Sequence, residues 1–166
     1  GCVPKKLLMY GSSFSSEIED AGGYGWQLSG DGHDWPSLID AKDRELDRLE
    51  AIYRSLLSNA GVELIEGRGV VSGPNSVRVG EREITAERLL IATGGWPQIP
   101  EVPGLAEHAI TSNEALDLAQ RTDRIIVYGA GDIACEFASI FNGFGIETHL
   151  AYRADLPLRG FDEEIR

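Results

Sequence analysis

The chain has 166 residues, enough for one ordinary domain or for parts of two. It is 42% hydrophobic and 25% charged, which is typical of a globular protein in water. Its net charge of -12 argues against nucleic acid, which needs a basic surface, and against an anionic membrane surface. No apolar run approaches the roughly 18 residues of a membrane-spanning helix. Two cysteines are too few for a disulfide scaffold and no signal peptide opens the chain, so we expect a cytoplasmic protein.

The first part of the chain predicts two helices. In residues 3–19, a proline stands in the first turn and Leu7, Phe14 and Ile18 share one face. A polar, glycine-rich loop through residues 30–32 follows. A long helix then opens at residues 34–37 and ends near Asn59 and Gly61. Its apolar face, at a 3.6-residue period, comprises Leu46, Leu49, Ile52, Tyr53, Leu56 and Ala60.

Residues 62–92 change to a period of two, which predicts a small meander. Four short strands are expected, at residues 62–65, 69–71, 77–79 and 89–92. Residues 73–75 and 80–81 are turn signals between them. A proline-rich crossing at residues 94–104 indicates a domain boundary, and residues 112–114 can cap a short helix through Leu118.

A glycine-rich turn stands near the C-terminal end, at residues 129–134 (GAGDIA). An apolar strand at residues 125–128 precedes it. A helix follows whose face comprises Ile133, Phe137, Ile140, Phe141 and Phe144, and residues 147–152 predict a second strand. This context predicts a dinucleotide pyrophosphate site at the helix N-terminus. Gly129 permits the tight turn, Gly131 the close approach of a phosphate, and Ala134 the packing of helix on strand; a strand–helix turn without a ligand is the alternative.

The end of the second predicted strand discriminates NAD from NADP. An NAD site has Asp or Glu there, whereas this chain has Arg153, with Arg159 six residues later. A guanidinium pairs well with a 2′-phosphate, so we predict NADPH. Asp155 is a weaker candidate for a ribose contact, and two solvated surface arginines are the alternative.

Cys2 lies at the N-terminal side of the first predicted helix, with Lys5 and Lys6 close by. The helix end and the two lysines both favour thiolate over thiol, which predicts a reactive sulfur. An ordinary buried cysteine is the alternative from these residues alone.

Four motifs occur in the order typical of one enzyme family. Residues 1–6 (GCVPKK) resemble the second half of a CxxxxCVPKK redox motif, and residues 90–97 (LIATGGWP) a flavin motif. Residues 111–115 (TSNEA) resemble the segment that joins flavin and nucleotide domains, and residues 152–162 the NADPH segment. On these motifs the whole chain resembles the pyridine nucleotide-disulfide oxidoreductases of class I, in particular those that reduce glutathione disulfide.

The resemblance implies catalytic roles for three residues. NADPH reduces FAD, the flavin reduces a cysteine pair, and the pair reduces glutathione disulfide. Cys2 matches the flavin-side cysteine, Lys5 the lysine near the flavin N5, and Glu136 the acid that pairs with that lysine. A cation near N5 stabilises the reduced flavin and a carboxylate orients the cation. No residue is assigned to a metal.

The resemblance also implies binding positions for FAD and for substrate. Gly69, Thr93, Gly94 and Ser112 match FAD contacts, with Thr93 and Gly94 the most specific and Gly69 open to interpretation as a bulge. Tyr53 matches a tyrosine at the glutathione disulfide site. Its position on the apolar stripe leaves a core aromatic as the alternative.

The expected architecture is α/β: a Rossmann-like, two-domain FAD/NAD(P) disulfide reductase fold. Residues 1–95 are predicted to form an FAD domain and residues 96–166 an NADPH domain, both incomplete. Against the family pattern the chain lacks the N-terminal GxGxxG unit, the partner cysteine, and a C-terminal domain that forms a homodimer. Asp132 stands where a tyrosine is common, which puts the nicotinamide gate in doubt. Reduction of a related disulfide such as trypanothione, or a non-catalytic piece, remain open.

Overall fold

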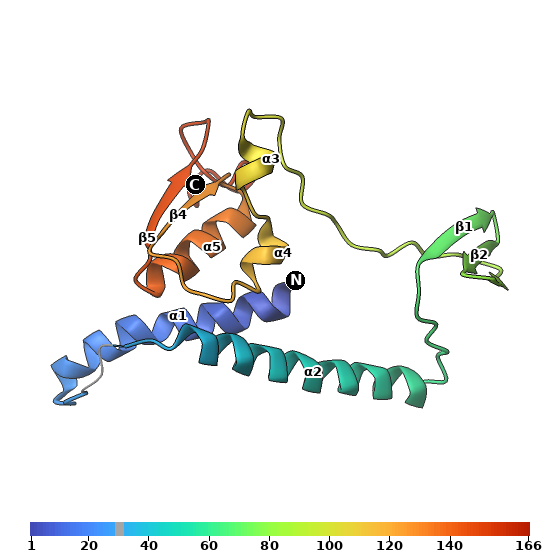
Figure 1. The fold of residues 1–166 in the computed structure, drawn as a ribbon, viewed down its shortest axis with the longest axis horizontal. Coiled ribbons are helices and arrows are strands. Elements are labelled where there is room, and N and C mark those ends of the chain that lie inside the picture. The colour runs from blue at the N-terminus through green and yellow to red at the C-terminus, as the bar shows by residue number, and fades with distance from the viewer. Residues whose placement is uncertain (29–31) are drawn as a thin grey trace. The chain divides into compact units, whose positions relative to one another are not determined.

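The computed structural model describes residues 1–28 and 32–166. Residues 30–31 of the predicted polar loop lie outside the described residues. The chain divides into two compact units, one of Gly1–Leu46 with Ile99–Arg166 and one of Asp47–Gln98. We call them unit 1 and unit 2 (Figure 1). The structure has mixed helices and strands, which agrees with the predicted α/β class.

Unit 1 contains a parallel pair of strands joined by a helix. β4 (Arg124–Tyr128) and β5 (Glu147–Ala151) pair in parallel, with Ile126 opposite His149. α5 (Asp132–Gly143) forms the crossover between them, as the turn pattern predicted. Ile125 and Val127 of β4 face the core that α5 helps to build.

The core of unit 1 forms where α5 packs between the strand pair and α1 (Cys2–Ala21), the helix predicted at residues 3–19 (Figure 1). Phe137, Ile140, Phe141 and Phe144 are buried as predicted, but Ile133 of the same expected face is 51% exposed. On α1 the buried residues are Leu8 and Ser12, whereas Phe14 and Ile18 of the predicted face are exposed. The period identified a helix, but burial follows the side that meets α5.

α2 (Trp35–Asn59) begins where predicted, because Asp34 accepts hydrogen bonds from the Ser37 backbone N–H at 3.3 Å and hydroxyl at 2.6 Å. Its buried residues are Trp35, Ile39 and Lys42. The Trp35 indole N–H donates to the Leu118 carbonyl at 2.7 Å. The apolar period correctly predicted this helix, but Ile52, Tyr53 and Leu56 of its apolar face are all more than 40% exposed.

Short helices occupy the turns of unit 1. η1 (Gly22–Tyr24), a 3-10 turn, follows α1, and α3 (Leu105–His108) and α4 (Ser112–Ala115) precede β4. The cap of α4 is Thr111 rather than the predicted residues 112–114, because its hydroxyl accepts from the Asn113 N–H while Glu114 accepts from the Thr111 N–H. α4 also ends before Leu118.

Unit 2 contains an antiparallel sheet in the order β1 (Gly69–Gly73), β2 (Ser76–Val79), β3 (Arg82–Thr85). The turns at 73–76 and 79–82 fall at the predicted signals, and Gly80 has φ +58°. β3 was not predicted. The strands expected at residues 62–65 and 89–92 are wrong, because neither pairs with a described strand; Leu90 is 91% exposed.

Candidate active site and nucleotide turn

An ion pair joins the first turn of α1 to the second turn of α5. The Lys5 ammonium donates to the Glu136 carboxylate, and the Lys6 ammonium lies 3.7 Å from the other Glu136 oxygen. The Lys5 side chain is only 13% exposed and that of Glu136 26%. The two predicted residues, 131 positions apart in the chain, therefore meet in a partly covered site where a charge pair is less screened than at the surface.

The electrostatics of this site centre on Lys5. The hydrogen bond to Glu136 raises the pKa of Lys5 above its ordinary value. Partial burial opposes that rise, and the charges of Glu136, Cys2 and Asp132 add to it. Lys5 is thus held as an ammonium, and both Cys2 and Asp132 lie within its electrostatic reach.

Cys2 is the first residue of α1 and its thiol is free and exposed. It precedes Lys5 by three residues, so the two side chains share a face of the helix. The structure thereby brings the three predicted catalytic residues, Cys2, Lys5 and Glu136, to one end of the α1–α5 contact. Cys135, the other cysteine, is half-buried within α5.

The glycine-rich turn leaves room for a ligand at the N-terminus of α5. Gly129 has φ +136°, a backbone conformation that strains any other residue, and a Cβ there would lie 3.7 Å from the Ala134 Cβ. A Cβ on Gly131, the N-cap, would meet nothing within 4 Å. The first-turn N–H groups of a helix have no intrahelical acceptor, so this end can receive an anion.

Two backbone hydrogen bonds fold the segment after β5 onto that turn. The Gly129 N–H donates to the Ala151 carbonyl at 2.9 Å, and the Leu158 N–H donates to the Ala130 carbonyl at 2.7 Å. An open hollow of about 230 Å³ lies between the two segments. It is lined by Ala130, Leu150, Tyr152, Ala154, Asp155 and Pro157.

The two arginines predicted to hold a 2′-phosphate do not line this hollow, although the neighbours of Arg153, Tyr152 and Ala154, do. Arg153 and Arg159 are exposed, and neither forms a hydrogen bond or ion pair with the residues that the structure describes. Each guanidinium is therefore available to an added anion. Asp155, the weaker candidate for a ribose contact, does line the hollow.

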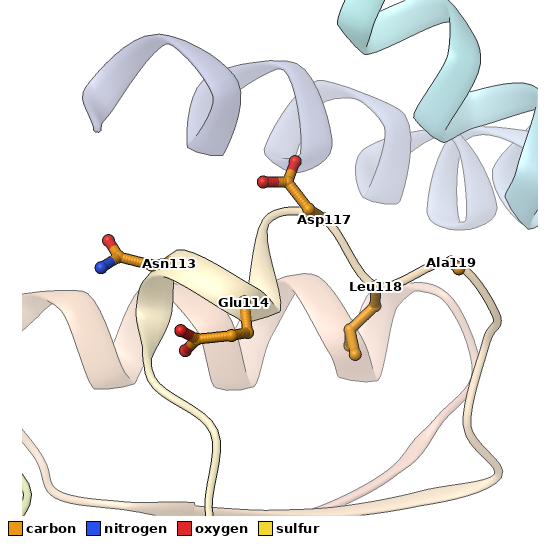
Figure 2. A pocket seen from close by; sticks show the side chains of 5 residues that line it. All are labelled: Asn113, Glu114, Asp117, Leu118 and Ala119. Atoms are coloured by element: carbon orange, nitrogen blue, oxygen red, sulfur yellow. The ribbon is translucent and has the colours of Figure 1, made fainter.

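Ser112, predicted to contact FAD, is the half-buried first residue of α4. A second hollow, of about 410 Å³, lies beside that helix (Figure 2). Asn113, Glu114, Asp117, Leu118 and Ala119 line it. Both of its carboxylates already have partners: Glu114 caps the helix at Thr111, and Asp117 lies 2.7 Å from the Lys42 ammonium. In Figure 2 the Asp117 carboxylate points away from Glu114.

Lys42 is a buried cation that sequence reasoning missed. Its side chain is 1% exposed and its ammonium donates to Asp117 at 2.7 Å and to Asp43 at 2.6 Å. Burial lowers the pKa of Lys42, but the two hydrogen-bonded carboxylates outweigh it and the net change is upward. The sequence near Lys42 gave no sign that this lysine is buried, because charged residues are common along the exposed face of a helix. Its partner Asp117 lies 75 residues further along the chain.

The remaining predicted residues belong to unit 2. Tyr53 lies on α2 and is 55% exposed; Gly69 begins β1, where a Cβ would lie 3.4 Å from Val77. Thr93 and Gly94 are exposed in an irregular segment, and Gly94 has φ +74°. Gly94 is thus a position that favours glycine. These four residues are not brought together with Cys2, Lys5 and Glu136 within one unit.

Comparison with known proteins identifies the class of protein to which the chain belongs. The chain belongs to the pyridine nucleotide-disulphide oxidoreductase family, whose family model matches residues 1–166. That family description implies flavin and pyridine nucleotide chemistry.

Among curated proteins, the chain is similar to glutathione reductases. It is 49% identical to the glutathione reductase of Burkholderia cepacia over 100% of the chain and 37% of that protein. It is 50% identical to the chloroplastic/mitochondrial glutathione reductase of Pisum sativum, over 98% of the chain and 30% of that protein. The trypanothione reductase of Leishmania donovani is 39% identical, over 100% of the chain and 37% of that protein. The chain thus spans about a third of the length of these relatives.

Proposed function

We propose that a protein of the relatives' length containing these 166 residues is an NADPH-dependent, FAD-containing reductase of glutathione disulfide. The observation that carries the proposal is the Lys5–Glu136 pair, with Cys2 on the same face of α1. Reduction of one glutathione disulfide consumes one NADPH and one proton and yields two thiols and NADP⁺. A reactive sulfur beside a fixed cation is suited to that exchange, since the thiolate is the nucleophile.

The residues of unit 1 fit a dinucleotide. Gly129 adopts a glycine-only conformation, a Cβ on Gly131 would point into open space, and the N-terminus of α5 offers free N–H donors. Arg153 and Arg159 are exposed and unpaired among the described residues. We assign the pyrophosphate of NADPH to residues 129–134, including Ile133 and Ala134, and its 2′-phosphate to the two arginines.

When bound, NADPH supplies a hydride and FAD passes the electron pair to a cysteine pair that includes Cys2. Lys5, kept protonated by Glu136, provides a fixed positive charge beside the flavin-side sulfur. The same charge and the N-terminus of α1 lie beside the Cys2 sulfur, where negative charge develops during the exchange. Thr93, Gly94, Gly69 and Ser112 are proposed to hold FAD, and Tyr53 the disulfide substrate.

The proposal includes the two-domain assignment, with an FAD domain at residues 1–95 and an NADPH domain at residues 96–166. It also includes a homodimer of the longer protein and a cytoplasmic location. None of the described helices is long and apolar enough to cross a membrane. Localisation of a tagged full-length protein tests the compartment, because the Pisum sativum relative is named as chloroplastic/mitochondrial.

Trypanothione disulfide is the second candidate substrate. The alignments with two trypanothione reductases extend over 181 positions, 15 more than this chain has, whereas the one with the Burkholderia cepacia glutathione reductase covers 166 positions. The chain is also less identical to the Leishmania donovani trypanothione reductase, at 39%, than to the Burkholderia cepacia glutathione reductase, at 49%. Both observations favour glutathione disulfide.

A chimeric enzyme tests the activity. The aligned segment of the Burkholderia cepacia glutathione reductase is replaced by these 166 residues, and NADPH oxidation is followed with glutathione disulfide and with trypanothione disulfide. We expect turnover with glutathione disulfide that Cys2→Ser abolishes, and at most weak turnover with trypanothione disulfide. A folded, flavin-containing chimera that reduces neither disulfide contradicts the proposed activity. A chimera that reduces trypanothione disulfide faster than glutathione disulfide contradicts the proposed substrate and favours the second candidate.

The isolated chain tests cofactor binding separately. FAD and NADPH are added anaerobically and the visible spectrum is recorded. A chain that stays colourless and does not oxidise NADPH supports the view that these residues alone are a non-catalytic piece.

Fluorescence titration of the isolated chain then compares the binding of NADPH with the binding of NADH. We expect Arg153→Gln to weaken NADPH binding roughly five- to tenfold and NADH binding little, because a charge-assisted pair to one phosphate is lost. Equal losses for both nucleotides contradict the 2′-phosphate assignment.

A further inference from the structure

α1 and α5 lie side by side and run in the same direction. Lys5 of α1 meets Glu136 of α5, and seven residues further along each helix Ser12 meets Gly143, where an added Cβ would lie 2.9 Å from Ser12. The Phe144 ring also reaches Gly11, where an added Cβ would lie 3.1 Å from its Cζ. Constant offset along two helical turns defines a parallel pair, so the two N-terminal ends lie next to each other.

The same register places Asp132 beside the start of α1. Asp132 is the first residue of α5 and precedes Glu136 by four residues, on the same helix face. Counted back by the same offset of 131 residues, Asp132 falls opposite Gly1, the residue next to Cys2 at the start of α1. The Lys5 ammonium interacts electrostatically with both Cys2 and Asp132.

Adjacent parallel N-termini concentrate positive charge. Each helix end carries roughly half an elementary positive charge, and the side chains of Lys5 and Lys6 add two formal charges. The opposing groups on α5 are the carboxylates of Asp132 and Glu136. Glu136 is held by Lys5 and Lys6, whereas Asp132 is exposed and makes no hydrogen bond through its side chain with the described residues.

We propose that Asp132 sets the reactivity of Cys2, because its carboxylate competes with the Cys2 thiolate for the positive field shared by the N-termini of α1 and α5 and by Lys5. Asp132 acts through that field and is a positioning residue, not a catalytic one. The coupling itself is a property of this chain, and only its consequence for disulfide exchange rests on the proposed function.

Alkylation of Cys2 by iodoacetamide measures the coupling without any cofactor. The thiolate sulfur bonds to the reagent's methylene carbon and iodide leaves, so the rate reports the thiolate. The background is Cys135→Ser, which leaves Cys2 as the only thiol. In that background Asp132→Asn should alkylate roughly two- to fivefold faster near neutral pH, the effect of one charge at about 8 Å in a medium between water and protein.

The controls separate charge from structure. Asp20→Asn removes the same charge from the other end of α1, about 27 Å away, and should leave the rate unchanged. Asp132→Glu should restore the original rate. The gain in Asp132→Asn should shrink in about 1 M salt, where screening acts over only about 3 Å. Asp132→Ser, which keeps a polar first turn, replaces Asp132→Asn if that variant loses helix by circular dichroism.

The outcomes are distinct from those of the activity test. A faster, salt-sensitive rate restored by Asp132→Glu supports the coupling even if the chimera fails to turn over. A rate in Asp132→Asn equal to that in Asp20→Asn overturns the proposal, even in a chimera that is fully active. A gain that salt does not change also overturns it, since that result indicates altered access to Cys2.

Discussion

Unit 1 and unit 2 use apolar residues differently. Unit 1 encloses a core in which Leu8, Trp35, Ile140 and Phe141 are at most 2% exposed. In unit 2 the large apolar side chains of α2 and of the segment after β3 are on the surface, with Ile91 72% and Trp96 82% exposed. Both regions contain helical or strand periods in their sequences. The difference shows that a period predicts an element, whereas burial requires a second surface from elsewhere in the chain.

The largest expected effect comes from a substitution in the core of unit 1, compared with one at an exposed position of unit 2. Phe141→Ala should lower the free energy of unfolding by about 3–5 kcal/mol, because it leaves a cavity in the core of unit 1. Ile91→Ala, in the exposed segment of unit 2, should change it by less than about 0.5 kcal/mol. Urea unfolding followed by circular dichroism measures both; similar losses would mean that Ile91 is also buried in solution.

A smaller effect tests how closely α1 and α5 approach within unit 1. Gly143→Ala would bring a Cβ to 2.9 Å from both the Cβ and the carbonyl oxygen of Ser12. Overpacking of this kind should cost about 1–3 kcal/mol of unfolding free energy. Gly23→Ala, whose Cβ would meet nothing within 4 Å, is the matched control and should be neutral or slightly stabilising. A neutral Gly143→Ala would show that the helices are further apart.

The cap of α4 should contribute less. Thr111→Ala removes the hydroxyl that accepts the Asn113 N–H at 3.2 Å and leaves Glu114 without one partner. We expect a loss of about 1 kcal/mol in urea unfolding. Ser in place of Thr111 should retain most of the stability, because it keeps the hydroxyl. An equal loss in both variants would assign the effect to the methyl group.

The smallest effect is a pH dependence confined to unit 1. Partial desolvation lowers the pKa of His33, an exposed residue whose ring centroid lies 4.6 Å from that of Phe144. Arg121 lowers this pKa further, and Asp34 opposes the change. The unfolded chain then binds the proton more readily. Stability from His33 is therefore complete above about pH 6.5 and is lost as pH falls from there toward the lowered folded pKa.

His33→Phe keeps a ring against Phe144 and removes the titration. Unfolding free energies at pH about 7.5 and about 5.5 should differ less in this variant than in the original chain. His149→Phe, at an exposed position on β5, controls for the loss of a histidine. An unchanged pH dependence in His33→Phe would show that other groups account for it.

Several features could be predicted because their signals are local. The glycine-rich turn, the strand before it and α5 follow from turn geometry and period within about twenty residues. β3 and Lys42 could not be predicted in this way. β3 lacks a strong apolar alternation and forms because β2 pairs with it. Lys42 donates a hydrogen bond to Asp117, which lies 75 residues away in the chain.

The sequence by itself determined the helix at Cys2, the glycine-specific turn at Gly129 and the motifs that indicate the family, because each depends on backbone preferences and chemistry of neighbouring residues. The resemblance implied that Lys5 pairs with Glu136, and the structure contains that contact. Only the tertiary structure decided that Leu8 rather than Phe14 is buried and that α1 packs on α5. Those contacts join residues far apart in the chain, and a helix period does not specify which partner another helix presents. Packing of α1 on α5 supplies that information.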